Sequence, residues 1–134
     1  MYETKQLELP GDLEEAELVV YLSWIRIGIA TAAFVAPRKV AGLWAGDEGS
    51  PTLTKPMMRS WAGREAALGV GLLMALRHDT GVRGWLEGGA LADAGDAAAV
   101  LMSFKRLPRM RRLGFVAASA GVAVLETRLA ASFD

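Results

Sequence analysis

Two aspartates lie in the middle of an otherwise apolar stretch of the chain, GWLEGGALADAGDAAAVLMSF, residues 84–104. Asp93 and Asp96 are three residues apart, so a helix would place both carboxylates on one face. A carboxylate in apolar surroundings is costly unless it meets a cation, a proton or hydrogen-bond donors. The pair is therefore a candidate for acid/base chemistry, or for binding a cationic or polar group.

Arginines and glutamates interrupt the other apolar stretches in the same way. Arg26 is central in the first stretch, on a helical face with Ser23, Ala30 and Ala33. The ionisable residues that we expect to share one interior are Arg26, Arg64, Glu65, Asp93, Asp96 and Glu126. Two cations against four carboxylates leave negative charge in excess. This excess predicts that at least one carboxyl group is protonated or that a cation binds.

These six residues have two interpretations. As a salt-bridge network between helices, they would only fix packing and register. As a site, the candidate catalytic residues are Asp93, Asp96, Glu65 and Glu126, where an aspartate would give a proton and a glutamate would take one. Arg26 and Arg64 would then stabilise a ligand or developing negative charge. Glu87 and Arg128 lie near helix ends, so we expect them outside this interior.

Other kinds of chemistry find little support in the sequence. The chain has no cysteine, which excludes disulfides and thiol catalysis, and its one histidine, His78, excludes a site with two imidazoles. The net charge is zero, so nothing favours nucleic acid as a partner. Asp93-x-x-Asp96 is similar to the metal-binding aspartates of CDP-alcohol phosphotransferases, yet those enzymes need further aspartates that this chain lacks. We therefore expect no metal and no cofactor.

Four apolar segments must position these residues, at roughly 18–36, 60–76, 84–104 and 113–131. Each is about long enough to cross, as a helix, a hydrocarbon layer about 30 Å thick. They predict one all-α domain, a four-helix transmembrane bundle with up-down-up-down order and a charged interior. The expected helices are 13–36, 57–77, 83–105 and 112–131, with Pro37 ending the first and Pro56 preceding the second. A soluble bundle that buries its apolar faces in an oligomer is the alternative architecture.

Basic residues give the expected orientation in the membrane. The loops after the first and third segments carry nine of them: Arg38, Lys39, Lys55, Arg59, Lys105, Arg106, Arg109, Arg111 and Arg112. The opposite side has four: Lys5, Arg77, Arg83 and Arg128. By the positive-inside tendency, both loops are cytoplasmic and both termini are extracytoplasmic. Trp61 and Trp85 stand where the second and third helices should begin, a position typical of the headgroup level.

The run W24-x-R26-x-G28, P37-R38, G63-R64-E65, G69-x-G71, R83-G84-W85 and D93-x-x-D96 resembles the small uncharacterised four-span membrane proteins of high-GC actinobacteria. The resemblance covers about residues 18–106. It implies a location in the bacterial inner membrane and brings no activity with it.

Three functions remain open at this stage. The first is an accessory or small-ligand-binding subunit whose polar interior takes a ligand, a proton or a partner helix. The second is a membrane-embedded enzyme of the isomerase or cyclase type, acting on a lipophilic substrate through the buried carboxylates. The third is a proton-coupled transporter subunit, which four short helices could form only as an oligomer. The expected partners are the lipid bilayer, a lipophilic small molecule, and a second copy or another membrane protein.

Overall fold

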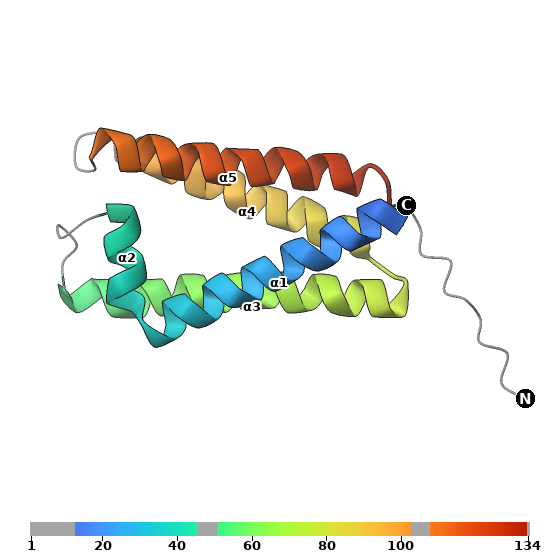
Figure 1. Ribbon diagram of the computed structural model, residues 1–134, viewed down its shortest axis with the longest axis horizontal. Coiled ribbons are helices and arrows are strands. Elements are labelled where there is room, and N and C mark those ends of the chain that lie inside the picture. Colours follow the sequence, from blue (N-terminus) through green and yellow to red (C-terminus); the bar gives the residue numbers. More distant parts are fainter. Residues whose placement is uncertain (1–12, 46–50, 103–107, 134) are drawn as a thin grey trace, which may run out of the picture.

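The computed structural model describes residues 13–45, 51–102 and 108–133, which form five α-helices and no strand. The helices are α1 (Leu13–Val35), α2 (Pro37–Ala45), α3 (Pro51–His78), α4 (Val82–Met102) and α5 (Arg109–Ala130). Successive long helices run in opposite directions, so α1 begins and α5 ends at the same end of the molecule (Figure 1). The all-α class that the sequence predicts is confirmed.

Three of the four expected helices lie close to their predicted ranges, whereas the second was placed wrongly. It begins at Pro51 and contains Pro56, which was expected to precede it. Proline at the first position of a helix costs nothing, because the N–H it lacks would have no partner there. Pro56 lies in the second turn and removes one backbone hydrogen bond. The expected loop residues 46–50 and the helix residues 103–105 lie outside the described part of the chain.

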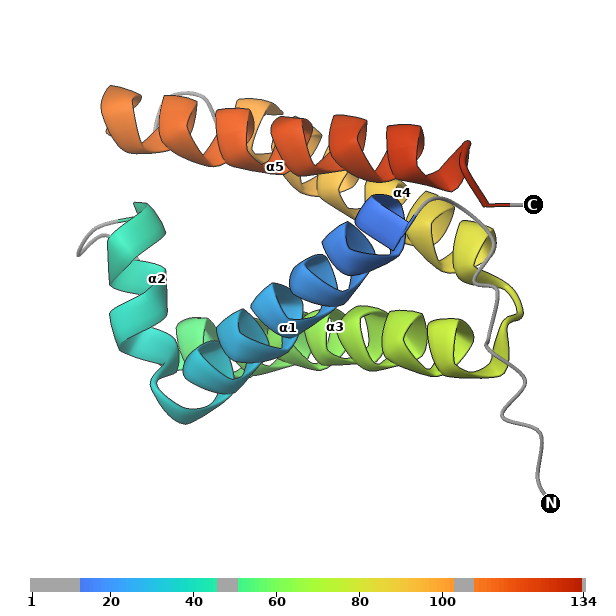
Figure 2. The same cartoon turned by 45° about the vertical axis from the view of Figure 1, so that its right-hand side comes forward.

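The short helix α2 is absent from the sequence-based prediction. Pro37 does end α1, as expected, but it also begins α2. The chain bends sharply at this point, and α2 lies across one end of the molecule (Figures 1 and 2). It contacts α1, α3 and α5. A segment predicted to be a connection therefore closes one end of the helix assembly.

The long helices form two pairs, with α1 packed along α3 and α4 packed along α5. At Gly69 a Cβ atom would lie 2.7 Å from the backbone oxygen of Ser23, so only glycine lets α3 come this close to α1. Near the start of α1 the pairs meet, where Ser132 donates a hydrogen bond of 2.6 Å to Glu15. Farther along, α1 diverges from α5, and the two helices do not pack closely there (Figure 2).

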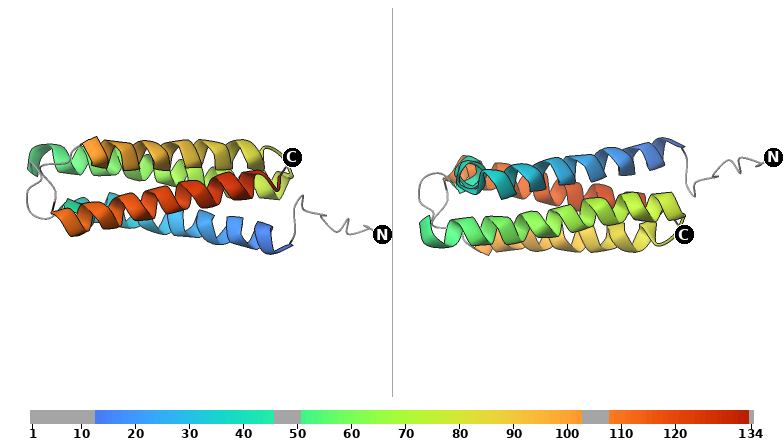
Figure 3. Two further views of the ribbon diagram at one scale, coloured as in Figure 1. Left: turned by 90° about the horizontal axis from the view of Figure 1, so that it is seen from above. Right: turned by 90° about the horizontal axis from the view of Figure 1, so that it is seen from below.

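Two apolar clusters occupy the two ends of the interior. The cluster near the start of α1 comprises Val19, Leu22, Leu72, Ala75, Leu76, Val82, Leu86, Leu129, Ala130 and Phe133. The cluster near α2 is built on Ala30, Ala33 and Ala62. The top and bottom views in Figure 3 show the long helices running side by side between these ends. The ionisable residues of the interior lie between the two clusters.

Two helices are long and apolar enough to cross a membrane by length and composition: Glu14–Val35 and Arg109–Ala130. The other long helices are not, since every 18-residue stretch of α4 contains Glu87, Asp93 and Asp96. Every such stretch of α3 contains Arg64, Glu65 and at least one further charge. The expectation of a membrane location therefore finds support in two helices, while four spans are not established.

Candidate functional site

Arg26 is the centre of the buried charges. Its side chain extends from α1 and is only 4% exposed. Nη1 donates to Oε2 of Glu65 on α3. Nη2 donates to Oδ2 of Asp93 on α4 and to Oε1 of Glu126 on α5, each at 2.5 Å. One guanidinium group thus connects all four long helices, including two that do not pack closely against α1.

The face of α1 that carries Arg26 is the one its sequence predicts. Ser23, Arg26, Ala30 and Ala33 are all buried, because spacings of three and four residues align them along one side of the helix. Ser23 satisfies its hydroxyl locally by donating to the backbone oxygen of Val19 at 2.7 Å. It therefore does not compete for the carboxylates.

Asp96 has a set of donors of its own. Arg64 donates to both of its oxygens, through Nη1 to Oδ1 at 3.0 Å and through Nη2 to Oδ2. The indole nitrogen of Trp61 also donates to Oδ2, at 3.1 Å. Arg64 lies within 3.2 Å of Glu65 Oε1 as well, so both oxygens of Glu65 face an arginine. A bidentate arginine and an indole N–H thus supply hydrogen-bond donors to both oxygens of Asp96.

Asp93 and Glu126 are less well compensated. They share a single nitrogen of Arg26, whose charge also faces Glu65. Glu126 has no exposed surface, and within the described residues its Oε2 has no hydrogen-bond partner. Gly89 lies directly against this carboxylate, because a Cβ atom added there would collide with it. The uncompensated negative charge of the interior is therefore concentrated on this pair.

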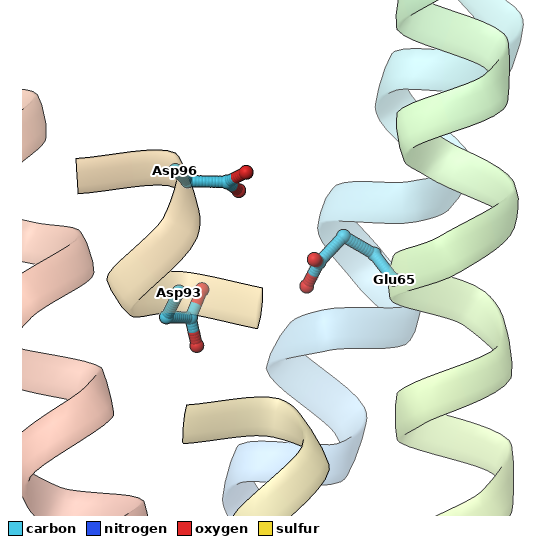
Figure 4. A group of neighbouring side chains, drawn as sticks. All are labelled: Glu65, Asp93 and Asp96. Carbon is cyan, nitrogen blue, oxygen red and sulfur yellow. The ribbon is translucent and has the colours of Figure 1, made fainter. Parts of the chain in front are cut away.

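We call Arg26, Arg64, Glu65, Asp93, Asp96 and Glu126 the charged cluster. On one side of it, one oxygen from each of Glu65, Asp93 and Asp96 lies within 4.8 Å of the others. Figure 4 shows the two aspartates on α4 and Glu65 reaching toward them from α3. Three carboxylate oxygens at this spacing suit the N–H donors of an ammonium group.

Two cavities adjoin the charged cluster. The inner cavity, about 110 Å³, reaches Arg26, Glu65, Asp93 and Asp96; the rest of its lining is Leu22, Ile25, Ile29, Trp44, Trp61, Phe115, Ala118, Ser119 and Val122. The side cavity, about 240 Å³, is lined by Ala41, Trp44, Met58, Trp61, Asp96, Ala99, Val100 and Phe115. A larger hollow between α4 and α5, about 550 Å³, contains none of the charged cluster.

The two cavities share four lining residues: Trp44, Trp61, Asp96 and Phe115. Trp44 on α2 meets Phe115 on α5 edge to face, with ring centroids 4.9 Å apart. α2 is held to α5 a second time by Arg111, which donates to the backbone oxygen of Gly42 at 2.5 Å. Asp96 is therefore the carboxylate at which an apolar space and the charged cluster meet.

The structure brings together all six residues that the sequence predicts for the interior, and Glu87 and Arg128 lie exposed, as expected. The sequence did not predict that Trp44, Trp61 and Phe115 line the cavities. Trp61 was placed at the membrane surface, yet it lies well inside α3 and bonds Asp96. The sequence does contain a hint of this position, because Trp61 lies four residues before Glu65 and so shares a helical face with it. On α5, the position of Phe115 could be inferred in the same way, because it shares a helical face with Ser119, Val122 and Glu126.

No protein-family model matches the chain, and no curated protein or solved structure shows significant similarity to it. The resemblance to small four-span actinobacterial proteins stays a prediction. The site is therefore interpreted from its own geometry.

Proposed function

We propose that this chain is a small integral membrane protein that binds a lipophilic molecule with a positively charged head group. One observation carries the proposal: two adjoining, largely apolar cavities meet at a buried cluster in which carboxylates outnumber arginines by four to two. The apolar body of the ligand would occupy the side cavity. Its head group would lie among the oxygens of Glu65, Asp93 and Asp96.

The membrane location is supported by what the helices leave exposed. A core helix of a soluble protein is mostly buried, whereas the apolar stretches of α1 and α5 are only 33% and 17% buried. Large apolar side chains cover the outside of α1: Leu18, Val20, Tyr21, Trp24, Ile25, Ile29, Phe34 and Val35 are all exposed. Exposed apolar surface on this scale marks contact with lipid or a partner.

The charges of α3 and α4 do not argue against four spans. Arg64, Glu65, Asp93 and Asp96 lower the hydropathy of these helices, but all four take part in the charged cluster. Charged residues in membrane helices turn toward the interior in this way and pair with each other. We therefore propose that α1, α3, α4 and α5 all cross the bilayer of a bacterial inner membrane, with the basic end that carries α2 in the cytoplasm.

A cationic head group fits the electrostatics better than a neutral or anionic one. Both arginines of the charged cluster are already bonded to carboxylates, so this cluster, as described, offers an anion no unpaired arginine. A cation would offset part of the negative excess. The enzyme alternative is less well supported for the same reason, because Arg26 and Arg64 would have to stabilise developing negative charge while paired.

The shape of the site supports a lipophilic ligand. Ile25 and Ile29 on α1 and Ala118 and Val122 on α5 line the inner cavity from opposite sides. These two helices do not pack closely against each other, so the cavity lies between them and, in a bilayer, this side would be next to the acyl chains. A molecule already dissolved in the membrane would reach the carboxylates without passing through water.

The proposal is tested with n-hexylammonium as probe and n-hexanol as the neutral control. The purified protein, in nanodiscs of zwitterionic phospholipid, is titrated with each compound in a calorimeter, and empty nanodiscs give the partitioning background. We expect saturable binding of n-hexylammonium, at least tenfold tighter than that of n-hexanol. Asp96→Asn should weaken binding of the ammonium at least tenfold, because it removes the carboxylate at which both cavities meet.

Glu87→Gln is the matched control. Glu87 is an exposed acid on the same helix as Asp96, paired with Arg83 at 2.8 Å and outside the charged cluster. Its variant should bind n-hexylammonium like the wild type. Equal affinity for ammonium and alcohol, or equal losses in the two variants, would overturn the proposal.

A further inference from the structure

We propose that Asp93 and Glu126 hold a proton between them, and that a cation entering the inner cavity releases it to water. The site would thereby exchange one cation for one proton. This inference rests on the proposed function, since it describes what happens in the same cavity when a cation binds. It adds a second ligand, the proton, and a second binding position, the carboxyl pair behind Arg26.

The first support is the distance between the two carboxyl groups. One oxygen of Asp93 and one of Glu126 each lie 2.5 Å from the same nitrogen of Arg26, so they are no more than 5.0 Å apart. Two ionised carboxylates this close repel each other strongly, and a shared proton relieves that repulsion. Glu126 Oε2, which is fully buried and has no partner in the described structure, adds a second and independent reason for a proton here.

The second support is that the other two acids of the cluster have donors of their own. Glu65 faces an arginine with each oxygen. Asp96 is held by Arg64 and by Trp61. These two carboxylates take both nitrogens of Arg64 and one nitrogen of Arg26. Asp93 and Glu126 are left to share the other nitrogen of Arg26.

The helices around Asp93 and Glu126 carry few groups that could compensate their negative charge. α1 contributes Arg26, α3 contributes Arg64 and Glu65, and α4 contributes Asp96 beside the pair. Among the described residues, α2 lines the inner cavity only with Trp44, and this indole side chain is uncharged. α5 contributes Glu126 itself; its buried Arg112 lies fourteen residues from Glu126, about 21 Å along the helix, and its Arg128 is exposed. Among the described residues, Arg26 is the cation that contacts the pair.

The charges then predict an exchange. With two arginines, four carboxylates and one proton, the cluster carries one net negative charge; with a bound cation in place of the proton, the net charge is the same. The inner cavity reaches Asp93 but not Glu126. A cation near Asp93 stabilises its ionised form, so the proton leaves the pair for water while the cation stays. The cation and the proton therefore compete for the carboxylate of Asp93, which is the group that the inner cavity reaches.

The inference is tested by counting protons. The protein in nanodiscs is placed at pH 7 in very dilute buffer with a pH-sensitive dye, and n-hexylammonium is added. This ammonium keeps its own proton at pH 7, because alkylammonium groups titrate near pH 10, as lysine does. We expect close to one proton released per cation bound. Glu87→Gln should release the same number as the wild type.

Glu126→Gln should release close to no proton per bound cation, whatever its affinity, because the pair that holds the proton is broken. If this variant does not fold, calorimetry of the wild type replaces it: the binding enthalpy should differ between phosphate and Tris buffers by the heat of one buffer proton. Binding without proton release overturns this inference and leaves the proposed function standing. Absence of saturable binding overturns the proposed function itself. Release of a full proton from the Glu126→Gln variant would show that another group holds the proton, and this result would also overturn the inference.

Discussion

The guanidinium group of Arg26 donates a hydrogen bond to Glu126, which lies 100 residues further along the chain. The helices that carry them, α1 and α5, do not pack closely against each other at this level. The contact is therefore made by the length of the arginine side chain and not by close approach of backbones. It joins the two helix pairs through the middle of the interior.

Removing this arginine should be the most damaging single change in the charged cluster. Arg26→Met keeps most of the side-chain volume but leaves three buried carboxylates without their common donor. Breaking a buried ion pair from one side costs about 3–5 kcal/mol. We expect a large drop in apparent thermal stability in detergent. Arg83→Met, which breaks an exposed pair with Glu87, should change stability by no more than about 0.5 kcal/mol. Equal effects of the two variants would contradict a structural role for Arg26.

Two neighbouring glycines on α4 give a second, internally controlled prediction. A Cβ atom at Gly89 would collide with the carboxylate of Glu126, while a Cβ atom at Gly88 would meet nothing within 4 Å. Gly89→Ala should destabilise the protein by about 1–3 kcal/mol, the usual cost of overpacking. Gly88→Ala should be neutral or stabilise by up to about 1 kcal/mol, because alanine favours the helix. Thermal unfolding of both variants measures the difference, and unchanged stability of Gly89→Ala would contradict the expectation that Arg26 holds the Glu126 carboxylate in place.

The wall that α2 provides can be tested at Trp44. This residue is half-buried, lines both cavities and meets Phe115, whereas its neighbour Leu43 is 73% exposed. Trp44→Ala should weaken n-hexylammonium binding about tenfold, because about 1.4 kcal/mol of apolar contact with the ligand is lost. Leu43→Ala should bind as the wild type does. The same calorimetric titration applies to both, and a matching loss in Leu43→Ala would assign the effect to α2 as a whole.

Membrane crossing can be tested directly, because the chain has no cysteine of its own. Single cysteines are placed at Lys39 on α2, at His78 at the far end of α3, and at Trp24 on the outer face of α1, all exposed. A membrane-impermeant maleimide should label Lys39→Cys only after the cytoplasmic side is opened and His78→Cys in intact spheroplasts. Trp24→Cys should resist labelling until detergent is added, since lipid covers it. Labelling of all three in intact cells, or recovery of the protein in the soluble fraction, would refute the membrane proposal.

The sequence predicted the charged interior well for a simple reason. Charged groups are costly in apolar surroundings, so they are expected to face the interior and pair with each other. This expectation applies to Arg26, Glu65, Asp93 and Glu126. The face of α1 followed from helical periodicity alone. The sequence did not predict which acid pairs with which arginine, because the pairing depends on how far apart the helices lie. The sharing of Arg26 among three helices is a product of that spacing.

The cavity walls could not be predicted for a different reason. Trp44 and Phe115 are 71 positions apart and meet only because α2 turns back across the end of the molecule. The sequence from Pro37 to Ala45 contains arginine, lysine and glycine, which are common in loops, so its helical form was not expected. Pro56 misled in the opposite direction, because it was expected to precede the helix, whereas α3 continues through it with the loss of one backbone hydrogen bond.

The order in which the ribosome makes these partners has a consequence for assembly. Arg26 is synthesised first, Glu65 a helix later, and Glu126 100 residues after Arg26. In a bilayer, the newborn first helix would carry an unneutralised charge at its centre, at a cost of about 2.5–3.5 kcal/mol, while three more helices are still being made. If the proposed membrane location is correct, biogenesis has to keep this helix beside the insertion machinery, or let its guanidinium bind a lipid phosphate, until α5 has been made.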